Sequence, residues 1–175
     1  MHLFLLYMSS FVMITALNYL TLSDQYKAAW VYYSTPVETP GRIMIGGLKA
    51  LYVKYFLPFY IVISVFVMYV WGPKAIWDIL LALINVTLFI SCIARINFRH
   101  LPFSMMEQMK QRGARIMKSF LVMLIPSFLG FGHFFAFGLL WLKLLFMVLS
   151  AIALWLVWDS YANTSWENVI KSELD

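Results

Sequence analysis

Charge and cysteine are both scarce in this sequence. Only 12% of the residues are charged, roughly half the share found in soluble domains, whereas 63% are hydrophobic. The one cysteine, Cys92, lies within an apolar run, so an internal disulfide is excluded. Neither a soluble domain nor a disulfide-stabilised domain fits this composition.

Motifs for catalysis are also lacking. The stretch 46–50, GGLKA, has neither the spacing nor the lysine–serine or lysine–threonine pair of a phosphate-binding loop. We find no paired carboxylates, no histidine–carboxylate cluster, and no serine or cysteine placed for nucleophilic attack. We therefore expect a protein that is not an enzyme, holds no metal and has no cofactor of its own.

Long apolar runs are what the chain does contain. A helix needs about 20 residues to cross a bilayer, and continuous runs indicate helices rather than alternating strands. The runs of suitable length are 1–22, 48–71, 75–96, 116–138 and 141–158. We predict an all-α integral membrane protein with about five transmembrane helices and two cytoplasmic amphipathic helices. A single transmembrane domain covers residues 1–175, with cytoplasmic segments at 23–47, 97–115 and 159–175.

The distribution of basic residues predicts the orientation. The net charge of +5 indicates topology and lipid contact first, so we expect no nucleic-acid partner. Most basic residues lie in the two long loops, whereas the short turns offer only Lys74 and Lys143. The long loops are then cytoplasmic, the N-terminus is outside and the C-terminal tail is inside. We expect a multi-pass protein of the cytoplasmic membrane.

The first long loop carries a polar, aromatic segment. Pro36 disfavours helix at the residue before it, which leaves residues 24–34 as a separate short helix. Tyr26, Trp30 and Tyr33 recur at helical spacing and share one face. The helix either lies in the headgroup layer or presents its aromatics to a cytoplasmic protein. The pattern alone favours the headgroup layer. Thr39, as N-cap before Pro40, predicts the start of the next helix.

The second long loop contains an amphipathic segment of its own. Met105 and Met109 form an adaptable apolar strip, and Lys110, Arg112 and Arg115 supply positive charge. Such a segment contacts either anionic lipid or a protein partner, and lipid is the simpler expectation.

Polar residues inside the runs are candidate sites. Asn85 is mid-span and is expected to make an interhelical hydrogen bond. His133 is deep in a span, where a neutral, hydrogen-bonded histidine near the outer interface is the simpler expectation. Haem ligation together with His2 is a third functional hypothesis. Asp78 is expected to pair with Lys74 at the end of its helix.

Residues 26–58, YKAAWVYYSTPVETPGRIMIGGLKALYVKYFLP, resemble the permease subunits of bacterial type-2 ATP-binding-cassette exporters. Residues 99–104, RHLPFS, resemble the second cytoplasmic loop of those proteins. The resemblance covers most of residues 23–119 and implies that helix 24–34 docks onto a separate cytoplasmic ATPase. Such permeases are usually longer, which implies a C-terminal part, a split subunit or a short form.

The functional hypothesis is thus a permease subunit of an ATP-driven exporter in a bacterial inner membrane. Its expected partners are the ATPase, membrane lipids, and a second permease half or a second copy. ATP would act only through the partner subunit. The alternative is a membrane assembly or accessory protein that transports nothing, and the third is the small haem-binding electron carrier.

Overall fold

The computed structural model describes residues 2–97, 100–105, 125–126, 128–134 and 139–169. Within these ranges the chain is helical, and its only extended pairing is an isolated bridge between Leu22 and Met105. The helical class is therefore confirmed. The elements are α1 (His2–Met8), α2 (Ser10–Leu20), the 3-10 turn η1 (Tyr26–Ala29), α3 (Trp30–Ser34), α4 (Gly41–Leu51), the π-helix η2 (Tyr52–Phe56), α5 (Leu57–Trp71), the 3-10 turn η3 (Pro73–Ala75), α6 (Ile76–Asn97) and α8 (Leu140–Ala162).

Four helical stretches are long and apolar enough to cross a membrane. They are His2–Leu20, Gly41–Trp71, Pro73–Ile96 and Leu140–Ala162. They correspond to the first, second, third and fifth predicted spans. The predicted span 116–138 falls largely outside the described residues, although residues 125–126 and 128–134 are helical.

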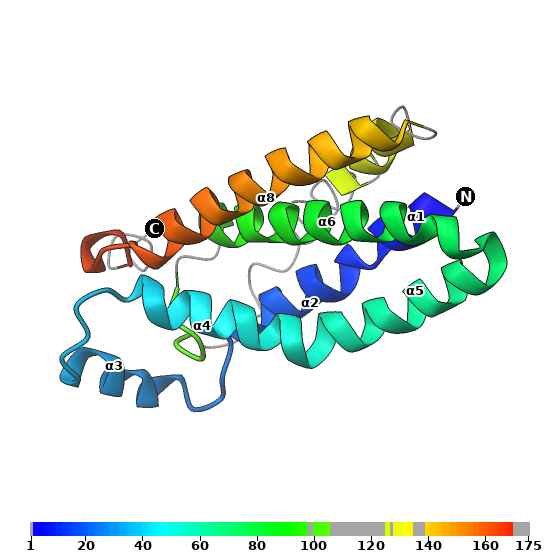
Figure 1. Cartoon of the computed structure of the whole chain (residues 1–175). Coiled ribbons are helices and arrows are strands. Elements are labelled where there is room, and N and C mark those ends of the chain that lie inside the picture. The colour runs from blue at the N-terminus through cyan, green and yellow to red at the C-terminus, as the bar shows by residue number, and fades with distance from the viewer. Residues whose placement is uncertain (1, 98–99, 106–124, 127, 135–138, 170–175) are drawn as a thin grey trace.

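The helices form an elongated bundle (Figure 1). α8 packs along α6, while α1 and α2 lie between α6 and the continuous α4–η2–α5 helix. The N-terminus and the η3 turn lie at one end. The start of α4, the end of α8 and the separate helix α3 lie at the other. Segments expected on opposite sides of a membrane are thus at opposite ends of the bundle.

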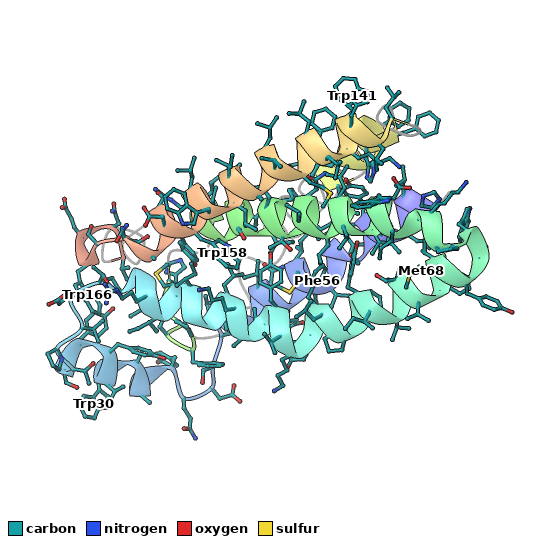
Figure 2. The ribbon with its side chains drawn as sticks, in the orientation of Figure 1. Trp30, Phe56, Met68, Trp141, Trp158 and Trp166 are labelled. Atoms are coloured by element: carbon teal, nitrogen blue, oxygen red, sulfur yellow. The ribbon has the colours of Figure 1, made fainter. Side chains whose placement is uncertain are left out.

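Apolar packing and tyrosine hydroxyls hold the long α4–η2–α5 helix against α6. Phe56 is fully buried in the middle of the bundle (Figure 2). The Tyr52 hydroxyl donates to the carbonyl of Thr87 at 2.8 Å, and that of Tyr60 donates to the carbonyl of Ile79 at 2.7 Å. These bonds satisfy buried phenols that would otherwise be costly to leave unpaired.

The start of α4 confirms one prediction and corrects another. The helix begins directly after Pro40, as expected, but Pro40 is itself the N-cap and no side-chain capping bond is made, so Thr39 does not act as the cap. The end of α8 contacts this end of α4 instead. The Gly41 amide donates to the carbonyl of Thr164 at 3.4 Å, and a Cβ atom on Gly41 would overlap the backbone of Tyr161. Glycine is needed here because the two backbones touch.

Candidate functional site: a buried polar cluster

Four helical segments bring ionisable side chains together at the end of the bundle that holds the N-terminus. Asp78 comes from the first turn of α6, His2 from α1, His133 from residues 128–134, and Lys143 from the first turn of α8. Their exposed fractions are 3% for Asp78, 3% for His133, 5% for His2 and 7% for Lys143. Ionisable groups buried to this extent are rare unless they pair with one another.

Asp78 is the centre of this cluster. His133 Nε2 lies 3.1 Å from Asp78 Oδ1, and the Lys143 ammonium forms an ion pair with the same oxygen. His2 Nε2 lies 3.5 Å from Oδ2. With an ionised carboxylate, a charged ammonium and neutral imidazoles, the four groups carry no net charge. Neutrality is what permits burial, because an unpaired ion inside a protein costs several kcal/mol.

A chain of hydrogen bonds extends the cluster from His133 toward the middle of the bundle. The Ser150 hydroxyl donates to Asn85 Oδ1 at 2.7 Å, and Asn85 Nδ2 donates to the Tyr7 oxygen at 3.0 Å. Tyr7 lies 3.2 Å from His133 Nδ1. The chain therefore joins α8, α6, α1 and residues 128–134.

These bonds fit one tautomer of His133. Tyr7 accepts from Asn85, and its hydroxyl proton is available to donate to His133 Nδ1. Nε2 then carries the imidazole proton and donates it to Asp78. With this tautomer a neutral His133 satisfies every bond in the chain.

The helix termini affect the two charges of the central pair differently. Asp78 lies in the first turn of α6, where the positive end of the helix dipole stabilises a carboxylate. Lys143 lies in the first turn of α8, where the dipole disfavours a cation. The direct ion pair with Asp78 offsets this penalty, so Lys143 depends on Asp78 more than Asp78 depends on Lys143.

Several sequence expectations are corrected here. Asp78 does not pair with Lys74, which is exposed; its recorded ionic partners are Lys143, His133 and His2. Lys143 is buried rather than free in a surface turn. The expectation that the chain has no histidine–carboxylate cluster is wrong.

The two predicted polar sites, Asn85 and His133, are joined through Tyr7, which the sequence reasoning missed together with Ser150. A lysine two residues into an apolar run was the available signal for Lys143.

Both ring nitrogens of His133 already face protein partners, an arrangement that favours helix packing over iron ligation. Across the part of the chain that the structure describes, no group of three or more histidine, cysteine or acidic residues is arranged for a metal ion.

The second candidate site is the aromatic helix of the first loop. Its helical stretch begins at Tyr26 rather than at residue 24, because the Gln25 amide bonds to the Ser23 hydroxyl at 3.1 Å in a preceding turn. Trp30 is 65% exposed and Tyr33 is 48% exposed, while Tyr26 is half-buried. Figure 2 shows Trp30 directed away from the bundle. The three aromatics therefore do not form one uniformly exposed face.

Trp166, near the C-terminus, supports this helix. Its ring lies 5.3 Å from that of Tyr33, and its Nε1 donates to the carbonyl of Val37 at 2.8 Å. The tryptophan lies between α3 and the end of α8 (Figure 2). α3 is thus held in place from one side while Trp30 stays exposed on the other. Sequence reasoning missed Trp166 because it comes from the distant tail.

The second loop is described only at its start. The Met105 amide donates to the carbonyl of Thr21, and the Ser23 amide donates to the carbonyl of Met105, each at 2.9 Å. The two long loops are therefore tied together at their roots. The predicted contact residues Met109, Lys110, Arg112 and Arg115 lie outside the described residues.

Comparisons with known proteins give no relative. No family model matches the chain, and neither curated sequences nor solved structures contain a significant match.

Proposed function

We propose that this chain is the membrane-spanning permease subunit of an ATP-driven exporter in a bacterial inner membrane. The observation that carries the proposal is α3, a short helix held outside the bundle between two candidate spans with Trp30 exposed. The resemblance of residues 26–58 to permeases of type-2 cassette exporters supports the same role. The chain has no phosphate-binding loop, so ATP would be hydrolysed by a separate subunit.

Exposed apolar side chains support insertion in a membrane. On α5, Val62 is 68% exposed and Ile61 58%; on α8, Leu156 is 55% exposed and Val148 57%. Such extended apolar surface is rare on soluble monomers and is expected where lipid surrounds a helix. Four candidate spans present this surface to the bilayer.

The lysine and arginine residues in the described part of the chain support an orientation with α3 in the cytoplasm. Lys27, Arg42 and Arg95 belong to segments at the α3 end of the bundle. At the opposite end Lys74 is exposed, whereas Lys143 is neutralised by Asp78. Excess positive charge at the α3 end favours the cytoplasmic side. The N-terminus is then outside and the C-terminus inside.

In this proposal α3 is the contact with the ATPase. A tryptophan exposed on a supported helix suits an interface anchor, because such hot spots are enriched in tryptophan and tyrosine. Tyr33 and Tyr26 flank this contact, and the second cytoplasmic loop extends it. The bundle is too small to enclose a wide path, so a second permease half or a second copy completes the transporter.

The test is copurification with a cassette ATPase encoded near the gene of this chain, whose presence is itself an expectation of the proposal. Trp30→Ala should lower the affinity by about 2 kcal/mol or more, a loss of roughly thirtyfold. Trp155→Ala is the matched control, because Trp155 is 66% exposed and belongs to α8 rather than to α3. ATP hydrolysis by the complex should fall with Trp30→Ala and not with Trp155→Ala.

Normal copurification and hydrolysis with Trp30→Ala would contradict docking. If, in addition, a peptide of residues 23–36 inserts its aromatics into vesicles, α3 is an interfacial helix. The accessory-protein hypothesis would then be the better description of the chain.

A further inference from the structure

An apolar groove lies on the outside of the bundle between α2 and the long α4–η2–α5 helix. Its volume is about 580 Å³, within the range of roughly 300–1,000 Å³ that is typical of small-molecule sites. Val12, Tyr19 and Leu20 line it from the first span, Ala50 and Lys54 from the second, and Phe103 from the loop after α6. Among its described lining residues Lys54 is the only charged one.

The charged end of the groove comes from the π-helix Tyr52–Phe56. Pro58 explains why the α-helix is interrupted there. Proline has no amide proton to donate to the carbonyl of Lys54, four residues earlier, and its ring crowds that carbonyl. π-Helical turns are uncommon and often occur at functional sites. Here the interrupted segment supplies two polar residues of the groove lining, Lys54 and Tyr55.

The charged end of the groove lies where a membrane interface is expected. Lys54 precedes Trp71 by 17 residues, so the two lie about 25 Å apart along a helix that rises 1.5 Å per residue. This separation is close to the thickness of the hydrocarbon core. If Trp71 marks one interface, Lys54 reaches the other. Tyr19 is 65% exposed and Tyr55 46% exposed at the same groove, as expected of interfacial tyrosines.

We propose that this groove is a binding site for one anionic phospholipid of the leaflet on the α3 side. An acyl chain lies along the apolar wall toward Val12, and the phosphate pairs with the Lys54 ammonium. The proposal rests on membrane insertion but not on transport or on ATPase docking. The apolar wall alone cannot select a lipid, because acyl chains in the bilayer are equally apolar. Selectivity therefore comes from Lys54.

The test is native mass spectrometry of the full-length protein, delipidated in detergent and titrated with phosphatidylglycerol or phosphatidylcholine. The first bound phosphatidylglycerol should be preferred about fivefold, which corresponds to about 1 kcal/mol for one basic side chain. Lys54→Gln should abolish the preference, and Lys54→Arg should retain it. Lys74→Gln, at the opposite end, removes the same charge and should leave the preference unchanged.

The groove itself is tested by filling it. Ala50→Trp should remove the first binding step for both lipids, whereas Val53→Trp should not, because Val53 is 66% exposed but does not line the groove. Equal binding of the two lipids to the unmodified protein, or equal effects of Lys54→Gln and Lys74→Gln, would overturn the proposal. So would displacement of the lipid by an equal concentration of glycerol phosphate, since the site would then recognise a free phosphate. Carbonate-resistant membrane association of each variant, measured separately, reports on insertion.

Discussion

The Asp78–Lys143 ion pair should be the most sensitive point of the bundle. Asp78→Asn keeps an acceptor for His133 but removes the carboxylate that forms the ion pair with the buried Lys143 ammonium. Removing one partner of a buried pair costs about 3–5 kcal/mol. Lys143 is 7% exposed and lies near the start of α8, so its stem allows some movement of the ammonium toward the surface. We therefore expect a loss of about 3 kcal/mol.

The opposite single substitution should cost less. Lys143→Met leaves the Asp78 carboxylate, but His133 and His2 remain within reach of its two oxygens. The carboxylate therefore keeps a polar partner at each oxygen, whereas Asp78→Asn removes the carboxylate that pairs with Lys143. We expect a loss of about 1–2 kcal/mol. A larger loss of stability for Asp78→Asn than for Lys143→Met distinguishes a four-member cluster from a simple pair of Asp78 and Lys143.

The double variant Asp78→Asn/Lys143→Met completes the thermodynamic cycle. It buries no unpaired charge, so its stability should lie within about 1 kcal/mol of the unmodified protein, since isosteric replacement of buried pairs is often neutral. The assay is thermal unfolding in one detergent, followed by size-exclusion chromatography. For a chain of this size 1 kcal/mol shifts Tm by roughly 2–4 °C, so Asp78→Asn should lower Tm by about 6–12 °C.

Asp159→Asn, at an exposed position of α8, is the control and should leave Tm unchanged. Additive effects of the two single substitutions, within about 0.5 kcal/mol, would refute coupling between Asp78 and Lys143. An unchanged Tm for Asp78→Asn would refute the buried charge cluster as a whole.

Three further outcomes follow from the contacts and the proposed orientation. Tyr7→Phe leaves His133 Nδ1 and the Asn85 amide unpaired and should lower the unfolding free energy by about 1–3 kcal/mol; no change in Tm would show that the chain of bonds is not formed. Gly41→Ala should lower Tm because its methyl group overlaps the end of α8, whereas Gly46→Ala, in open space, should raise stability by roughly 0.5–1 kcal/mol; equal effects would contradict the close approach. Lys74→Cys should react with an impermeant thiol reagent on intact cells, and labelling only after permeabilisation would invert the proposed orientation.

Apolar run length predicts the candidate spans because bilayer thickness and helix rise are fixed quantities. The second span shows the limit of this reasoning. The helix was expected to start near Pro40 and the span only at residue 48, but a single helical stretch long and apolar enough to cross a membrane runs from Gly41 to Trp71, because α4 has one polar face and still continues the same helix. Pro58 in the sequence indicates a kink near this point, but not that the helix becomes π-helical at Tyr52–Phe56.

The partners in the polar cluster depend on which helices are neighbours, and local spacing does not contain that information. Lys74 lies four residues from Asp78 and was the natural partner by helical periodicity. The packing of α8 along α6 brings Lys143 to Asp78 instead. Tyr7 and Ser150 resemble ordinary span residues in the sequence, and only the packed bundle joins them through Asn85.

Contacts along the length of α8 suggest that α8 and α6 behave as one rigid unit. Lys143 pairs with Asp78 near one end, Trp158 Nε1 donates to the Ser91 hydroxyl at 2.8 Å, and Arg95 donates to the Ser160 hydroxyl at 2.8 Å near the other. The long second helix differs, because its hydrogen-bond ladder changes at η2. If α3 transmits a displacement from an ATPase, the displacement reaches α4 first, since α4 follows α3 in the chain. The π-helix is then where α4 can bend relative to α5 while α6 and α8 stay together.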